Sequence, residues 1–307
     1  MPAMPTIPVI PSLRNLAIRS QTLQACREFF WRAGFLEVET PVRIPTPAPE
    51  LHIHAPPSGK AWLRTSPELH MKRLLASGCE RIFQIGPCFR EGERGSRHAP
   101  EFTLLEWYRT SADYTDILRD CQELLRYVVR RVTGGESMTL RDEQINIVAP
   151  WIHITVQDAY LQHTGWDPVE AYDADRFDLD MVNKIEPVLP TERPCILTDY
   201  PAAAAALARL KPYNPRVAER WELYLGGIEI ANAYSELTDA AAQRTRFEAV
   251  NAARRQAGQT AYPLDEPFLA ALQQGLPPCG GIALGLDRLV MLLCGAQTID
   301  ASRAFCP

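Results

Sequence analysis

Charged and aromatic residues gather in the segment 89–102, which reads FREGERGSRHAPEF. Arg90 follows one predicted strand and Phe102 begins the next, so both side chains border the loop between the strands. A guanidinium binds phosphate oxygens and an aromatic ring stacks on a nucleobase, so this pair suits ATP. The alternative is a charged hairpin that is merely solvated.

A glycine-rich turn with the sequence GGIALGLDRL covers residues 280–289. Small residues such as Gly285 let a nucleotide approach the backbone, and Arg288 opens the following helix, under the phosphates. A glycine-rich turn alone is a weak signal. Its G-x-D-R ending and its place after the charged segment make it specific.

Several strands must position these residues. The segments 81–89 and 102–108 are rich in β-forming residues and predict an antiparallel pair with a long loop. Further strands are predicted over 62–64, 196–200, 221–224 and 227–234, and a strand over 282–284 leads into a helix over 287–294.

Helices flank these strands. Apolar spacing predicts a helix from Asn15 to Trp31 that ends at Gly34, followed by a strand over 35–39. A helix is predicted to start at 65–68, with Pro in its first turn, and two others cover 114–132 and 240–257. Thr155 lies three residues before Asp158, which is the spacing of one more helix start. Hairpin-like strands with flanking helices predict an α+β fold with an antiparallel sheet rather than a doubly wound one.

Composition and length favour one domain over residues 1–307. The chain is 46% hydrophobic and 22% charged, which is typical of a globular enzyme core. We interpret residues 1–12 as a Pro-rich N-terminal extension and the polar segment 165–194 as an insertion. No secretory signal pattern and no run of roughly 18 apolar residues occurs, so we expect a cytoplasmic protein without a membrane partner.

The remaining composition excludes other classes of site. The eight cysteines form no C-x-x-C pair, which argues against a disulfide framework or a structural zinc site. We interpret His52 and His54 as surface residues of a possible strand, and Lys72 with Arg73 as a solvated helix face. The net charge of -5 makes tRNA an unlikely partner.

Three segments occur in the order of the signature motifs of class II aminoacyl-tRNA synthetases, which the chain therefore resembles. They are GFLEVETP at 34–41, the charged segment together with LEWY at 105–108, and the glycine-rich turn. Taken alone, the first segment is better explained by ordinary core packing. The resemblance implies the catalytic core of that class, with an antiparallel sheet flanked by helices, and a homodimer formed through the first motif.

Within that class, the segments 65–68 and 222–239 resemble the lysine pocket of lysyl-tRNA synthetase. The resemblance implies that Glu236 and Tyr108 hold the ε-ammonium group and that Glu68 holds the other amino group. Asn232 and Arg90 would then hold the carboxylate. A buried ammonium group needs such partners, because an unpaired buried charge is very costly. The other implied substrate-binding residues are Ser66, Tyr234 and Ala283.

ATP and Mg²⁺ are the implied substrate and cofactor. Arg90, Arg288 and Glu229 would be catalytic, and Glu222 with Glu229 would bind Mg²⁺, which prefers carboxylate and phosphate oxygens. The acids of this strand could instead be surface charges. The ATP site would also contain Glu91, Glu93, His98, Phe102, Ile230 and Gly285. The sequence leaves open which of the two second-motif carboxylates meets ATP.

The first motif begins near residue 29, which leaves no room for the N-terminal OB-fold domain of lysyl-tRNA synthetases. This layout resembles the elongation factor P lysine ligases, which form (R)-β-lysyl adenylate and pass the acyl group to a lysine of that factor. Ala283, where the synthetases usually have Gly, and the acidic net charge favour the same interpretation. We therefore predict activation of (R)-β-lysine or lysine, with elongation factor P as the acyl acceptor.

Two alternatives stay open. One is a truncated lysyl-tRNA synthetase-like enzyme that acts on tRNA or a small molecule. The other is a non-catalytic paralogue that binds lysine or a nucleotide, although a pure binder has no need for two phosphate-binding arginines.

Overall fold

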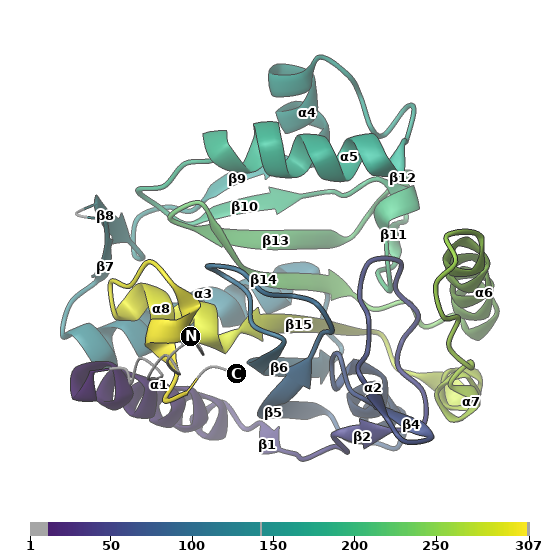
Figure 1. The fold of residues 1–307 in the computed structure, drawn as a ribbon, viewed down its shortest axis with the longest axis horizontal. Helices are drawn as coiled ribbons and strands as arrows, with labels where there is room; N and C mark the ends of the chain where they lie inside the picture. Colours follow the sequence, from purple (N-terminus) through teal and green to yellow (C-terminus); the bar gives the residue numbers. More distant parts are fainter. Residues whose placement is uncertain (1–11, 142, 306–307) are drawn as a thin grey trace, which may run out of the picture.

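An eight-stranded sheet runs through the computed structural model, which describes residues 12–141 and 143–305 (Figure 1). Residues 1–11 of the extension predicted over 1–12 lie outside the described residues, as do Asp142, Cys306 and Pro307. In spatial order the strands are β1 (Leu36–Glu37), β5 (Arg81–Phe89), β6 (Glu101–Thr110), β15 (Cys279–Gly285), β14 (Ile228–Ser235), β13 (Arg220–Leu225), β10 (Cys195–Thr198) and β9 (Ile152–Thr155).

The predicted α+β class is confirmed, and the predicted antiparallel pairing holds for the six inner strands. It is wrong at both edges, where β1 pairs with β5 and β9 pairs with β10 in parallel. Parallel neighbours need a crossover that carries the chain back, and helices lie between the paired strands in both cases.

One face of the sheet is covered by three helices that pack on one another: α1 (Leu13–Arg32), α3 (Tyr114–Thr133) and α8 (Leu286–Leu293). They bury a core that includes Phe30, Phe83 and Trp107. Ile82 and Tyr108, the alternate residues of the same strands, belong to a second core with α2 (Glu68–Ala76) and α7 (Glu266–Gly275). Since successive strand residues point to opposite faces, α2 and α7 cover the opposite side of the sheet.

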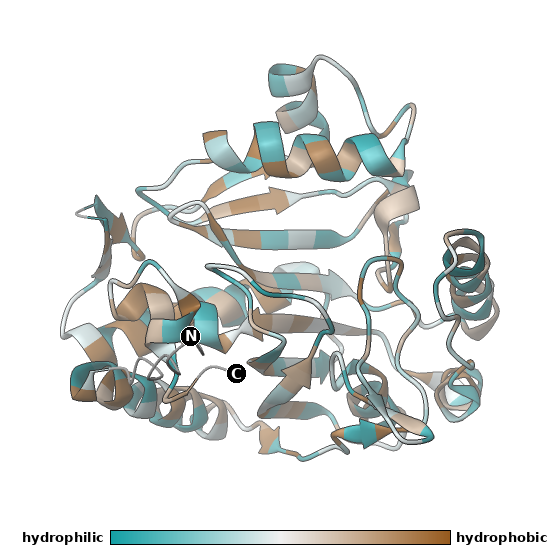
Figure 2. Ribbon diagram, viewed as in Figure 1, coloured by the Kyte–Doolittle hydropathy of each residue, from teal (hydrophilic) through white to brown (hydrophobic). Residues whose placement is uncertain are grey.

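The remaining helices lie at the periphery. α4 (Val156–Thr164) and α5 (Ala174–Asp180) lie outside β9 and β10, and α6 (Ala240–Gln256) packs against α7. Figure 2 shows that the sheet strand β10 is more hydrophobic than the peripheral helix α6, because β10 is largely brown and α6 is mostly teal. No helix in the described part of the chain is long and apolar enough to cross a membrane.

Residues 165–194 form ordered structure. After α5 the chain continues in a π-helical turn, Met181–Ile185, and a 3₁₀ turn, Glu186–Val188. Phe177 and Ile185 are buried in a cluster with Tyr160 of α4 and Leu197 of β10. The interpretation of this segment as an insertion stays a prediction.

Local capping explains where the long helices begin and end. The Asp113 side chain accepts hydrogen bonds from the backbone of Thr115 and Asp116, and the Asp116 side chain accepts one from the backbone of Asp113. This capping box starts α3, and Gly134, at φ 72°, ends it in the left-handed conformation. Thr155 caps α4 through the backbone of Asp158, as its spacing predicted.

Several elements were not predicted from the sequence. β1 is shorter than the strand expected over 35–39, and His52 and His54 do not lie on a strand. α7 was missed altogether. Three small sheets were also missed, except for the strand β4. The first contains β2 (Arg43–Ile44), β4 (Ala61–Leu63) and β3 (Pro57–Ser58). The second pairs β7 (Ser137–Leu140) with β8 (Glu143–Asn146), and the third pairs β11 (Leu210–Lys211) with β12 (Asn214–Ala218).

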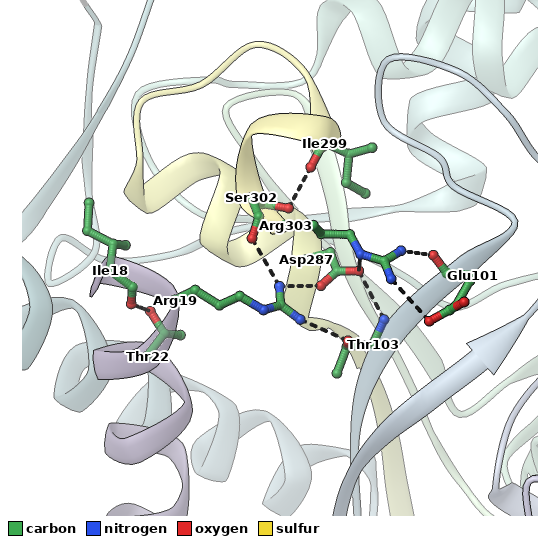
Figure 3. A network of polar contacts seen from close by, with 9 residues as sticks. All are labelled: Ile18, Arg19, Thr22, Glu101, Thr103, Asp287, Ile299, Ser302 and Arg303. Carbon is green, nitrogen blue, oxygen red and sulfur yellow. Dashed lines mark hydrogen bonds and ion pairs between the residues drawn. The ribbon is translucent and has the colours of Figure 1, made fainter. Parts of the chain in front are cut away.

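A buried carboxylate of the glycine-rich turn joins α8 to α1 and β6 (Figure 3). Asp287, at the start of α8 and 1% exposed, pairs with Arg19 of α1 at 2.6 Å. Its second oxygen accepts a hydrogen bond of 3.0 Å from the backbone N–H of Thr103 on β6, and Arg19 also donates to the Thr103 hydroxyl at 2.9 Å. Arg303 lies 3.9 Å from the same carboxylate. The network fixes α8 against α1 and against β6, one strand of the charged hairpin.

Replacement of Asp287 should therefore destabilise the whole fold. Asp287→Ala leaves the Arg19 guanidinium without its buried partner, and we expect the free energy of unfolding to fall by about 3–5 kcal/mol in urea denaturation. Glu170→Ala, which removes one partner of the exposed pair with Arg216, should cost less than about 1 kcal/mol. Equal losses in the two variants would contradict the role assigned to the network.

Candidate active site

A cavity of about 280 Å³ opens on the α2 side of the sheet, between the β5–β6 loop and strands β13, β14 and β15. All but three of the site residues predicted from the sequence line it; Glu91, Tyr108 and Glu236 do not. The predicted residues on its walls are Ser66, Glu68, Arg90, Glu93, His98, Phe102, Glu222, Glu229, Ile230, Asn232, Tyr234, Ala283, Gly285 and Arg288.

The register of four antiparallel strands assembles the cavity floor. Glu222 of β13 faces Asn232 of β14, Asn232 faces Ala283 of β15, and Ala283 faces Glu106 of β6. Directly opposed residues lie within about 5.5 Å of each other, so this row brings residues from distant segments into one line. The next row on the same face contains Arg220, Tyr234, Gly281 and Tyr108.

Arg288 holds one end of the cavity. Its guanidinium donates to the backbone oxygen of Glu229 at 2.7 Å and to the Glu229 carboxylate at 3.1 Å, and it lies 2.7 Å from Nε2 of His98. Burial and the Arg288 charge lower the pKa of His98, so the imidazole is neutral near pH 7 and accepts this hydrogen bond. Arg288 is thereby presented to the cavity in a fixed orientation.

Arg90 also lines the cavity. Its guanidinium stacks on the Phe102 ring, with 5.1 Å between them, and lies 3.8 Å from the Glu93 carboxylate. Glu91 is exposed and donates its backbone N–H to the His54 oxygen at 2.7 Å. Of the two second-motif carboxylates, Glu93 is therefore the one in position to meet a bound nucleotide.

Glu222 and Glu229 form a coupled pair of carboxylates with pKa values shifted in opposite directions. Burial and repulsion by Glu229 raise the pKa of Glu222. Burial would also raise the pKa of Glu229, but the attraction of Arg288 outweighs it and the pKa is lowered. Arg220 donates to Glu222 at 2.7 Å and to the Asn232 side chain at 3.1 Å, so it orients both acceptors.

At the opposite end, hydroxyl groups orient a buried carboxylate, Glu106. Ser66 and Tyr108 each donate a hydrogen bond of 2.8 Å to it. Burial raises the pKa of Glu106 to about 7, and repulsion by Glu68 adds to the rise. With Glu68 on the neighbouring wall, this end offers two carboxylates to cationic groups in the cavity.

Lys72 was wrongly interpreted as part of a solvated helix face. It is 1% exposed, and its ammonium group lies 2.5 Å from both the Glu68 and the Glu236 carboxylates. Burial would lower the pKa of Lys72, but Glu236 and Glu68 together raise it, so the side chain stays charged. Glu236, predicted to hold a substrate ammonium group, is thus paired in this structure with an ammonium group of the chain itself.

Sequence reasoning missed Glu106, Arg220 and Lys72. A signal existed for the first two, because Glu106 lies two residues from Tyr108, and Arg220 two residues from Glu222, on the same faces of their strands. For Lys72 the spacing of four residues from Glu68 on a helix was available, but it predicts an exposed pair as readily as a buried one.

Metal-binding groups are sparse. No group of three or more His, Cys, Asp or Glu side chains is arranged to hold a metal ion within residues 12–141 and 143–305. Glu222 and Glu229 supply two carboxylates of the kind Mg²⁺ prefers, and a nucleotide would supply phosphate oxygens. The seven described cysteines are free thiols.

Comparisons with known proteins give consistent results. The sequence profile of the tRNA synthetases class II (D, K and N) matches residues 11–307. A protein of Vibrio cholerae serotype O1 named elongation factor P–(R)-β-lysine ligase is 40% identical over 96% of this chain and 95% of its own length. The protein of the same name from Hamiltonella defensa is 37% identical over 95% of each chain. A lysine–tRNA ligase of Dehalococcoides mccartyi is 36% identical over 92% of this chain and 61% of its own length.

Gly281, in the row next to the cavity floor, should be less replaceable than Gly285. A Cβ atom there would overlap the Tyr108 ring and a Glu236 oxygen, whereas a Cβ at Gly285 would make only ordinary contacts of 3.6 Å or more. We expect Gly281→Ala to lower the free energy of unfolding by about 1–3 kcal/mol in urea, while Gly285→Ala stays near the wild-type value. Identical denaturation midpoints for both variants would contradict this geometry.

Proposed function

The chain belongs to the class II tRNA synthetases (D, K and N), and from this premise we propose that it activates (R)-β-lysine, or lysine, with ATP. The acyl group of the adenylate is then transferred to a lysine side chain of elongation factor P. This acceptor is proposed from the names of the relatives that the chain matches along 95% of their length.

The row Glu222, Asn232, Ala283 and Glu106 carries the proposal. The same cavity is lined by two arginines suited to phosphate, Arg90 and Arg288, and by two carboxylates suited to ammonium groups, Glu68 and Glu106. A diamino acid fits such a floor with its carboxylate beside Arg90 and Asn232 and its ammonium groups toward Glu68 and Glu106. Tyr108 orients Glu106 through a hydrogen bond, and Glu236 is linked to Glu68 through Lys72. The direct contact of Glu236 and Tyr108 with the ε-ammonium group stays a prediction.

The first step is adenylate formation. A carboxylate oxygen of the amino acid forms a bond to the α-phosphorus of ATP, the bond from that phosphorus to the pyrophosphate oxygen breaks, and pyrophosphate leaves. Arg90 and Arg288 stabilise the charge that develops on the phosphate oxygens, so catalysis rests on positioning and electrostatics. Glu222 and Glu229 would hold Mg²⁺, which would neutralise phosphate charge.

The second step is aminolysis. The acceptor amine forms an amide bond to the adenylate carbonyl carbon, the bond from that carbon to the AMP oxygen breaks, and the amine releases a proton to solvent. The Ala283 methyl group lies on the floor between Asn232 and Glu106, where it would adjoin the backbone of a bound amino acid. Its bulk favours an amino group moved from the α to the β carbon, which supports β-lysine over lysine.

A homodimer and a cytoplasmic location belong to the same proposal. Trp31 at the end of α1 and Leu36 on the edge strand β1 are 56% and 59% exposed, and both adjoin the first motif. Large apolar side chains exposed together are typical of a protein interface. We propose that two chains associate through this edge of the sheet.

The proposal is tested by pyrophosphate exchange followed by acyl transfer. We expect exchange with (R)-β-lysine to exceed exchange with L-lysine at least about tenfold, and mass spectrometry to show one β-lysyl adduct on elongation factor P. Arg288→Ala should lower exchange about 10²–10³-fold, while Arg130→Ala, at an exposed site on α3, should not. Preference for L-lysine with transfer to tRNA would support the synthetase-like alternative, and no exchange with either amino acid would refute the activity.

The pH dependence of substrate binding should follow the titration of the Glu106 carboxyl group. With a pKa raised to about 7, its carboxyl group is mostly protonated at pH 6 and mostly ionised at pH 8, and an ammonium group favours the ionised form. The KM for the amino acid should therefore fall as pH rises, by up to about tenfold per pH unit below pH 7. Glu106→Gln should remove this dependence, and the exposed Glu170→Gln should retain it. An unchanged profile in Glu106→Gln would assign the titration to another group.

A further inference from the structure

A second cavity, of about 410 Å³, adjoins the first. The two share Glu50, Arg220, Glu222 and Glu229 in their linings, so these residues lie on the boundary between the spaces. Its mouth lies among exposed residues, with the side chain of His52 62% and that of Asp178 56% exposed. Its inner end is closed by buried Glu222 and Tyr224. It therefore leads from the surface to the candidate active site.

The walls combine apolar surface with carboxylates. Phe177 and Met181 from the segment 165–194 line it together with Leu207 and Phe247. Glu186, from the 3₁₀ turn that follows Met181–Ile185, also lines it, and no hydrogen bond or ion pair of its side chain occurs among the described residues. A long aliphatic side chain with a cationic end is complementary to such a space.

The two arginines of the lining, Arg220 and Arg246, are already engaged. Arg220 is bound to Glu222, Asn232 and the Ala204 backbone oxygen, and Arg246 donates to the backbone oxygens of Ala206 and Ala208. Carboxylates outnumber these arginines in the lining. A polyanionic nucleic acid strand would meet unfavourable charge here, whereas an ammonium group would meet favourable charge.

We propose that this second cavity is the entry channel for the acceptor lysine side chain of the protein substrate, with the segment 165–194 forming one wall. The proposal rests on the function proposed above and adds the path of the second reactant. The butyl chain lies between Met181 and Phe247, and Glu186 attracts the ammonium group as it enters. At the inner end the amine reaches the adenylate carbonyl from the side of Glu222 and Glu229.

The test separates activation from transfer. Met181→Trp fills the channel. Val182 is the next residue and is 60% exposed, so Val182→Trp places the same ring in solvent. We expect Met181→Trp to lower the rate of β-lysyl transfer to elongation factor P at least about tenfold while pyrophosphate exchange stays within about twofold of wild type. Val182→Trp should leave both rates unchanged.

A charge variant keeps the test decisive if the large ring prevents folding. Glu186→Lys reverses the charge on the channel wall and should raise the KM for elongation factor P about tenfold with normal exchange; hydroxylamine, a small neutral amine, should trap the adenylate at the wild-type rate. Normal transfer in both channel variants, or equal loss in Val182→Trp, would overturn the channel. Absence of exchange in the wild-type protein would instead refute the proposed function itself.

Discussion

The register of strands β13, β14, β15 and β6 is the constraint on which the candidate site depends. Glu222, Asn232, Ala283 and Glu106 come from three widely separated parts of the chain, yet strand pairing places them in one row. A slip of one residue in any strand would turn its member of the row to the opposite face, toward the core under α1, α3 and α8. The same hydrogen bonds that hold the sheet together therefore determine which side chains meet a substrate.

Buried charges reinforce this register because each of them needs a partner. Asp287 joins α1, β6 and α8 through Arg19 and the Thr103 backbone, so the third motif cannot shift without exposing a charge to an apolar interior. Lys72 has a similar effect at the other end, where it links Glu68 of α2 to Glu236 after β14. This pairing holds Glu236 in a fixed position behind the cavity, while Glu68 and Glu106 line the cavity itself.

The two adjoining cavities divide the proposed reaction in space. The first has the arginines and carboxylates suited to a nucleotide and a diamino acid, and the second has an apolar passage with a free carboxylate, Glu186. Glu222 and Glu229 lie on the boundary between them. A side chain that enters through the second cavity would meet an adenylate in the first without displacing the groups that hold it.

The sequence alone determined the inner strands, most helices and the order of three motifs, because residue periodicity, helix caps and glycine turns act over a few neighbouring residues. It also identified most of the residues on the cavity wall, including Arg90, Glu229 and Arg288. Tertiary structure decided the parallel edges of the sheet, the burial of Lys72, the position of Glu93 rather than Glu91 on the cavity wall, and the second cavity. Each of these depends on which distant segments pack together, and a local pattern of charge or hydropathy is the same whether its partner is solvent or protein.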